Sequence, residues 1–365
     1  MAPSDRPLRR ATLDFRHDDP SAEAAVIRED LSACELTGSC LWLGCDETTT
    51  IQRLVRVDDG NFARHRSFDI GKALALPGGA EEEIDIEGFA EDAGFLWLTG
   101  SHSLKRKKPK RRDDPAAALA RLSEVTASPN RDLLARLPLV ATPDGLFELG
   151  GLGQVEDPGN RAPACLPMSG GRNDLARALA DDVHIGRFVD VPSKENGLDI
   201  EGIAVRGNRV FLGMRGPVLR GWAIVLELAV AEAGPGVLAL SPVGGHGEPY
   251  RKHFLDLAGL GIRDLAFDGD GLLILAGPTM DLDGPVRVHR WADVLEADQG
   301  DVVGENDLER VLELPFGEGV DHAEGMTLLA AGGAKELLVV YDSPSPSRLH
   351  DNGTAIDAEV FAIRG

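Results

Sequence analysis

The sequence contains few cysteines and no long apolar run. Only 4 of its 365 residues are cysteine, and no two of them have the C-x-x-C spacing of a zinc site. We therefore expect Cys34, Cys40, Cys45 and Cys165 to be buried free thiols. No stretch is long and apolar enough for a signal peptide or a membrane span, so we expect a cytoplasmic location and no membrane partner.

Positive charge is also scarce. Lys and Arg number 38 against 60 Asp and Glu, which gives a formal net charge of −22. General nucleic-acid binding is not expected of such a chain, because it repels the phosphate backbone. Residues 105–112 are the exception, since this dense basic run follows closely after His102. The run is either a solvated loop or a local contact for phosphate or another polyanion.

What the sequence does contain is a short repeated motif, here called the phrase, whose copies differ by substitutions. Each copy precedes an apolar run that is typical of the second strand of a hairpin, and the copies cover residues 31–34, 85–90, 199–204, 262–266 and 322–327. A fixed polar position before a repeated hairpin is typical of a β-propeller, because every blade points that position at one shared axis. We therefore predict an all-β fold consisting of a single β-propeller domain over residues 1–365.

The spacing of the phrases sets the expected number of blades. Glu87 lies 55 residues after Ser32, while Asp264 and Glu324 follow Glu201 at intervals of 63 and 60 residues, which suits four-stranded blades. The gap of 114 residues between Glu87 and Glu201 leaves room for a sixth blade or for an insertion. Five blades are preferred and six are the alternative, because the outer strands can be assigned without another blade.

The second blade absorbs the surplus residues in this scheme. Its insertions are expected at residues 101–130 and 141–183, with short helices over 115–124 and 174–182 and a fourth strand over 186–191. The last blade ends after its third strand. Residues 10–15 at the N-terminus are expected to supply the missing strand and close the ring, because an open ring would leave strand edges unpaired.

The fixed polar position suggests a metal site. It is occupied by one residue per blade, namely Ser32, Glu87, Glu201, Asp264 and Glu324. Four carboxylates in one narrow channel raise one another's pKa, and a bound divalent cation would relieve that repulsion. Oxygen ligands without histidine suit Ca²⁺ better than Zn²⁺. The alternative is that these side chains cap strand-end amides and line a watery channel.

A second set of polar residues follows the second strands, at the same face of the propeller. Arg215 stands among glycines and offers a planar fork for phosphate or carboxylate, so it is a candidate substrate ligand. His102 could act as acid or base, and Asp342 could orient it or bind metal. A structural role for Arg215 or His102 is equally open. Further candidate substrate ligands are Ser101, Asp46, Lys107 and Lys108.

Three phrases resemble a known family. Residues 97–107, 192–202 and 213–217 together look like the bacterial domain-of-unknown-function 3616 family, which implies a propeller without an assigned activity. The layout of residues 31–36 and the acidic pair that begins at Asp46 is similar to that of apyrase-type calcium-activated nucleotidases, five-bladed propellers with a central Ca²⁺. Their arginine-bearing motif has no counterpart at residues 48–50. Esterase-like propellers related to phytase carry a phrase similar to residues 201–204.

These observations lead to two functional hypotheses. In the first, the protein is a metal-dependent hydrolase of a phosphoester or related ester, in which Arg215 holds the anionic group and His102 or Asp342 handles protons. In the second, it is a non-catalytic scaffold that recognises a protein or a small anionic ligand. No G-x-S-x-G elbow, glycine-rich phosphate loop or H-E-x-x-H motif favours another chemistry. The oligomeric state stays open.

Overall fold

Strands dominate the structure, a computed structural model. It describes residues 5–16, 30–45, 48–80, 82–153, 155–243, 247–280, 282–297, 300, 302–331, 334–350 and 353–363. Among them the only α-helices are α2 (Pro115–Ser123) and α3 (Asp174–Ala180), which confirms the all-β prediction. In the described part of the chain, no helix has the length and apolar character needed to cross a membrane.

Two groups of strands pair antiparallel in chain order, the first as part of a larger sheet and the second as a sheet of its own. The first contains β2 (Leu31–Thr37), β3 (Cys40–Cys45), β4 (Thr50–Arg56) and β5 (Asn61–Asp69). The other contains β20 (Gly261–Asp268), β21 (Gly271–Gly277), β22 (Val286–Trp291) and β24 (Glu309–Leu314). Each of these two groups has the four strands that the spacing of the repeated phrases suggested.

In each of the two groups between them, two short strands share the outer edge of the last long strand. One runs through β6 (Ile86–Asp92), β7 (Phe95–Gly100) and β10 (Leu134–Ala141), and its edge is shared by β11 (Phe147–Leu149) and β12 (Ala164–Cys165). The next runs through β15 (Asp199–Arg206), β16 (Arg209–Leu219) and β17 (Trp222–Gly234). Its edge is shared by β18 (Val237–Ser241) and β19 (Arg251–Asp256), with β23 (Val302–Val303) beyond β19.

The strand expected over residues 186–191 is wrong. Residues Gly186–Phe188 form a 3-10 helix instead, and the edge of β10 is paired by β11 and β12. The apolar side chains that suggested a strand serve another purpose, because Val189 is buried in the core cluster that holds Ile185 and α3. Alternating apolar residues in a short segment do not distinguish a strand from a packed turn.

The last group is closed by the N-terminus, as predicted. It contains β25 (His322–Ala331), β26 (Ala334–Asp342), β28 (Ala355–Ile363) and β1 (Arg9–Asp14), with β27 (Leu349–His350) also paired to β28. All six residues of β1 pair antiparallel with β28. Ala11 and Leu13 are fully buried there, so β1 closes a core as well as a hydrogen-bonded edge.

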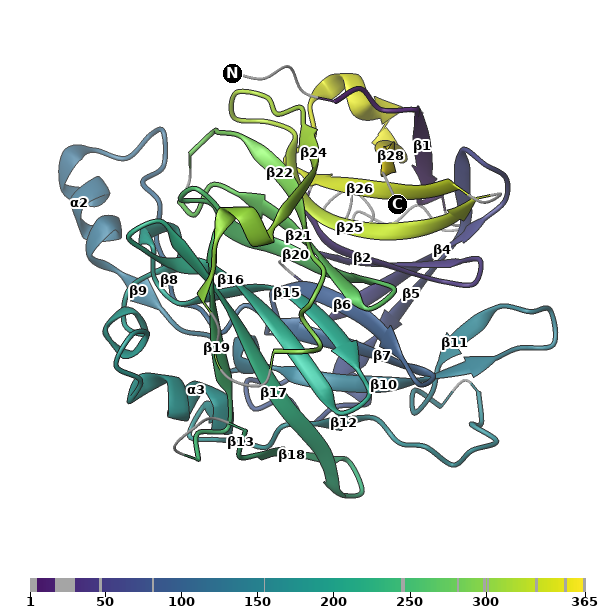
Figure 1. The fold of residues 1–365 in the computed structure, drawn as a ribbon, viewed down its shortest axis with the longest axis horizontal. Coiled ribbons are helices and arrows are strands. Elements are labelled where there is room, and N and C mark those ends of the chain that lie inside the picture. The colour runs from purple at the N-terminus through teal and green to yellow at the C-terminus, as the bar shows by residue number, and fades with distance from the viewer. Residues whose placement is uncertain are drawn as a thin grey trace.

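The first strands of the five groups lie side by side around one axis (Figure 1). β2 contacts β6, β6 contacts β15, β15 contacts β20, β20 contacts β25, and β25 contacts β2 again. This closed ring of inner strands is the arrangement of a β-propeller. Short parallel pairings, such as Thr12 with Asn61 and Cys165 with Val237, join neighbouring groups into larger sheets. The number of blades therefore depends on where the sheets are divided and stays a prediction.

Both predicted helices are present in the long connections around β10. α2 lies between β8 (Lys105–Arg106) and β9 (Val125–Thr126), and Asp114 caps its N-terminus. α3 follows the hairpin of β13 (Met168–Ser169) and β14 (Arg172–Asn173), and the Asn173 side chain caps it. No residue of α2 is buried. Figure 1 shows α2 at the periphery of the molecule, whereas α3 packs its leucines against the body.

Candidate functional site

Each inner strand carries a β-bulge at one position. The register against the second strand shifts at Ser32, Glu87, Glu201, Arg263 and Glu324. A bulge leaves one residue outside the ladder and turns its side chain in a new direction, here toward the shared axis. In β20 this position belongs to Arg263, one residue before the Asp264 that the sequence repeat suggested. The ring of acidic residues is thus interrupted by a cation.

Asp264 stands one residue after the bulge, where neighbouring inner strands approach closely. At the equivalent positions a Cβ on Gly88 would lie 3.0 Å from the Glu201 carbonyl oxygen, and one on Gly202 would lie 2.9 Å from the Asp264 carbonyl carbon. The Asp264 carboxylate accepts hydrogen bonds from Leu265 N and Met326 N, both at 2.7 Å. It links β20 to β25, which is the capping role named as the alternative to metal binding.

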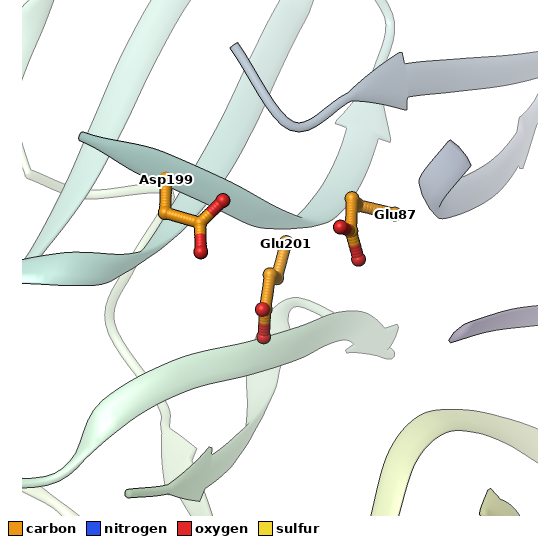
Figure 2. Close-up of side chains that lie close together, drawn as sticks. All are labelled: Glu87, Asp199 and Glu201. Atoms are coloured by element: carbon orange, nitrogen blue, oxygen red, sulfur yellow. The ribbon is translucent and has the colours of Figure 1, made fainter. Parts of the chain in front are cut away.

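Three carboxyl groups meet at the axis (Figure 2). Glu87 from β6 and both Asp199 and Glu201 from β15 each have an oxygen within 4.8 Å of the others. All three side chains are buried, with exposed fractions of 8%, 1% and 2%. Glu87 and Glu201 were expected here, and Asp199 was not. The triad could hold a metal ion, since hard cations prefer such oxygen ligands.

Arginines compensate part of this negative charge. Arg215 from β16 contacts Asp199 through Nη2 and lies 2.7 Å from Glu201 Oε1 through Nη1. Arg263 Nη1 lies 3.2 Å from Glu201 Oε2 and 2.5 Å from Glu324 Oε1. On the opposite side, Arg131 Nη1 lies 3.1 Å from Asp85 Oδ2. Among the described residues around this centre, the buried ones are five carboxyl groups and three guanidinium groups, namely Asp85, Glu87, Asp199, Glu201 and Glu324 with Arg131, Arg215 and Arg263.

The pKa values of several of these carboxyl groups lie above their ordinary values. Burial raises the pKa of Glu201 to about 8, although Arg215 and Arg263 lie against it. Burial also raises the pKa of Glu324 and of Asp85 above their ordinary values. A divalent cation bound between these carboxyl groups would lower their pKa values again, because it favours the charged form.

A cavity of about 550 Å³ opens above the triad. Its floor contains Glu87, Asp199, Glu201 and Arg215, and its rim contains basic side chains from the run at residues 105–112. The rim side chains are Lys105, Arg106, Lys107 and Lys108, together with Arg121 of α2 and Lys194. Lys107 and Lys108 thus lie beside the acidic floor, as the sequence suggested. The cavity thus places a buried acidic triad close to basic side chains.

His102 does not reach this cavity. Its side chain is 1% exposed, with Nδ1 2.9 Å from the Gly100 carbonyl oxygen and Nε2 3.0 Å from Asn173 Nδ2. These contacts fit a neutral ring that donates from Nδ1 and accepts at Nε2. Burial lowers the pKa of His102 below its ordinary value, which agrees with a neutral ring. Ser101 is fully buried and accepts a hydrogen bond at 2.9 Å from Ser103 Oγ, so Ser103 lines the cavity in its place.

Of the remaining predicted site residues, some line the cavity and others do not. Asp342 lines the cavity and accepts a hydrogen bond from Ser343 Oγ at 3.2 Å. Ser32 instead donates to the Ile86 carbonyl oxygen at 2.5 Å and is 1% exposed. Glu324 lines the cavity but is engaged by Arg263. Asp46 lies outside the described residues.

Sequence reasoning missed Asp199 and Arg263. A signal for Asp199 existed, because it stands two residues before Glu201 in the same strand, and such residues share a face. Asp85 has the same offset from Glu87, but it precedes β6 and has a left-handed backbone with φ 63°. No comparable signal pointed to Arg263, because aligning the phrases on their acidic residues conceals the bulge.

The sequence matches a profile of the family described as "Protein of unknown function (DUF3616)" over residues 30–358. The chain belongs to this family. All five bulge positions of this DUF3616 protein fall within the matched residues. Among curated proteins none matches the sequence, so the looser resemblances to nucleotidases and phytase-related propellers stay predictions.

Several solved structures are similar in fold. Glutaminyl cyclase from Myxococcus xanthus has 8% identity and a TM-score of 0.39, covering 98% of this chain and 100% of that chain. The PQQ-bound aldose sugar dehydrogenase of Streptomyces coelicolor has 12% identity and a TM-score of 0.36, with coverages of 97% and 99%. The RRP9 WD40 repeats have 9% identity and a TM-score of 0.36, with coverages of 97% and 98%. At these values the likeness carries no information on activity.

Proposed function

We propose that this DUF3616 protein binds a divalent cation, Ca²⁺ in the first instance, and hydrolyses a phosphoester or related ester in the central cavity. The observation that carries the proposal is the combination of a buried oxygen triad with a basic rim in one cavity. Phosphoryl transfer and hydrolysis use a cation site and an anion site together.

The triad supports the cation part of the proposal. Glu87, Asp199 and Glu201 supply only oxygen atoms, which suits Ca²⁺, Mg²⁺ or Mn²⁺ better than Zn²⁺. Because Arg215 and Arg263 contact Glu201, the cation would share that carboxyl with them or replace one of them. A bound cation of this kind polarises a substrate oxygen and lowers the pKa of bound water.

Arg215 supports the anion part. Its Nη1 and Nη2 are held by Glu201 and Asp199, but its Nε–H is buried and has no acceptor among the described residues. A buried donor without a partner is costly, so Arg215 would gain a hydrogen bond if its guanidinium turned Nε–H toward an anionic oxygen in the cavity. Lys194 is exposed at the rim and has no ion pair within the described part of the chain, so its charge is also available.

Asp342 is the candidate for proton transfer. Its side chain lines the cavity, and the hydroxyl of Ser343 and the ring of His322 lie at 3.2 Å and 3.9 Å from its oxygens. A carboxylate in this position can accept a proton from an attacking water and return it to the leaving group. His102 has no part in this scheme, because both of its ring nitrogens face protein atoms away from the cavity.

The test is a hydrolysis assay on a panel of phosphomonoesters, phosphodiesters and carboxylic esters, with Ca²⁺, Mg²⁺, Mn²⁺ or a chelator. We expect turnover with a cation and none with the chelator. Glu87→Gln and Asp199→Asn should each reduce kcat/KM by roughly a hundredfold or more. Glu91→Gln is the matched control on the same strand, because Glu91 is exposed and outside the cavity. Turnover unaffected by the chelator or by the triad variants would contradict the proposal.

A non-catalytic binding function is the second candidate, and one observation favours it. Arg215 and Arg263 already neutralise much of the acidic floor, as in a purely structural ion network. In that case the cavity would bind a small anion through Arg215 and the rim without reacting with it. Binding of inorganic phosphate together with no turnover on the whole panel would support this candidate over the hydrolase.

A further inference from the structure

A smaller pocket of about 40 Å³ adjoins the cavity on the side of β20 and β21. We call it the side pocket. It shares Lys194, Arg215, Glu324 and Asp342 with the cavity, so the two spaces lie side by side. Its other side carries the apolar side chains of Pro278, Met280, Leu282, Val286 and Phe316, together with Asp283 and His322, which lie 3.3 Å apart.

The apolar wall comes from two connections of the same sheet. Pro278, Met280 and Leu282 follow β21, and Phe316 follows β24. Met280 and Leu282 are apolar but 40% and 61% exposed, so they are accessible to solvent. Single exposed apolar residues are ordinary, but several that converge on a pocket are typical of a ligand site.

Ionic side chains, among them Arg215, Arg263 and Glu324, line the same pocket as these apolar residues. Arg263, whose Nη2 also donates to the Pro278 carbonyl oxygen at 3.1 Å, fixes the start of the apolar connection against the acidic floor. A ligand that spans both spaces would therefore place an anionic group near Arg215 and an apolar group against Leu282 and Phe316.

We propose that the substrate carries a short aliphatic group next to its anionic group, and that the side pocket holds this group. The inference rests on the proposed function, because it places the anionic group in the cavity. The volume limits the size of the aliphatic group. A cavity that holds benzene has a volume of roughly 150 Å³, so a pocket of about 40 Å³ suits a chain of two to four carbon atoms better than a ring.

Alkylphosphonates test this inference independently of catalysis, because their carbon–phosphorus bond resists hydrolysis. Methyl-, ethyl-, propyl- and phenylphosphonate are titrated into the full-length protein by calorimetry, with and without Ca²⁺. We expect the dissociation constant to fall roughly fourfold for each methylene group up to propyl. Phenylphosphonate should bind no more tightly than the ethyl compound.

Two variants locate the aliphatic group. Leu282→Asn and Phe316→Ala should flatten the series, so that methyl- and propylphosphonate bind within about twofold of each other. Leu8→Asn is the matched control, because Leu8 is 56% exposed and lies outside the pocket. Equal affinities across the series, a gain that survives both variants, or no binding of any phosphonate would overturn the inference. A graded series without ester hydrolysis would sustain it while refuting the hydrolase proposal.

Discussion

Arg263 Nη1 lies 2.5 Å from Glu324 Oε1, and this contact joins two neighbouring inner strands at the axis of the propeller. It exists because the bulge of β20 falls on Arg263 and not on Asp264. The same guanidinium reaches Glu201 on the other side. The centre of the molecule is therefore an alternating network of carboxylates and arginines, with more carboxyl groups than guanidinium groups.

Removing Arg263 should destabilise the protein strongly. Arg263→Met leaves Glu201 and Glu324 buried without their shared cation, and such a loss typically costs about 3–5 kcal/mol. Urea unfolding would measure this free energy. Arg310→Ala, which removes an exposed ion pair with Glu313, should cost no more than about 1 kcal/mol. Adding Glu324→Gln to Arg263→Met should recover part of the loss, and no recovery would argue against the pairing.

Asp264 provides a test of its structural role. Asp264→Ala removes the acceptor of two buried backbone N–H groups and should cost about 1–3 kcal/mol for each that stays unsatisfied. Asp264→Asn should cost less, since its amide oxygen still accepts one of them. In thermal-shift measurements neither variant should reduce the stabilisation that Ca²⁺ gives relative to the cation-free protein. A lost cation response in Asp264→Asn would make Asp264 a ligand, as the sequence repeat first suggested.

Glu35 should make the protein less stable as the pH rises. It lies at the other end of the inner strands, where its carboxylate accepts a hydrogen bond from Thr327 Oγ1 at 3.3 Å. Burial raises its pKa from 4.5 to about 8. Between these values the folded state holds a proton that the unfolded state has lost, so unfolding releases it and is favoured by higher pH.

The measurement is the free energy of unfolding from about pH 5 to about pH 8. Glu35→Gln should flatten the decline by roughly 1 kcal/mol per pH unit relative to the wild type, because glutamine does not titrate. Glu156→Gln is the control, because it removes an exposed carboxyl group in another part of the chain. Parallel wild-type and Glu35→Gln curves would mean that Glu35 titrates normally in the folded protein.

The basic rim and Arg215 should differ in their response to salt. Neutralising Lys107, Lys108, Arg111 and Arg112 together should weaken inorganic phosphate binding about tenfold at low salt, with a smaller loss at high salt. These side chains lie at the surface, where charges are screened over about 8 Å at physiological ionic strength. Arg215→Lys keeps the charge but removes the Nε–H donor, and because Arg215 is buried the loss should persist at high salt. If both variants lose phosphate binding with the same salt dependence, the basic run and Arg215 do not bind phosphate in different ways.

The repeat in the sequence was sufficient to predict the propeller, its closure by residues 10–15 and the approach of Glu87 to Glu201. Those features depend on hydrophobic pattern and spacing, which a sequence displays. The positions of Arg263 and His102 could not be predicted, because they depend on bulge register and on which partners the buried side chains find. Asp199 lies between these cases, since its offset from Glu201 was visible but its partner Arg215 was not.

The most direct test of the cation site is a crystal structure of the protein soaked in Mn²⁺, recorded for anomalous scattering. Mn²⁺ replaces Ca²⁺ or Mg²⁺ at oxygen sites and is located without assumptions about its ligands. The account predicts an anomalous peak coordinated by oxygen atoms of Glu87, Asp199 and Glu201, and no such peak in Asp199→Asn crystals treated in the same way. The absence of a peak in the wild type, with Arg215 still bridging Asp199 and Glu201, would contradict it.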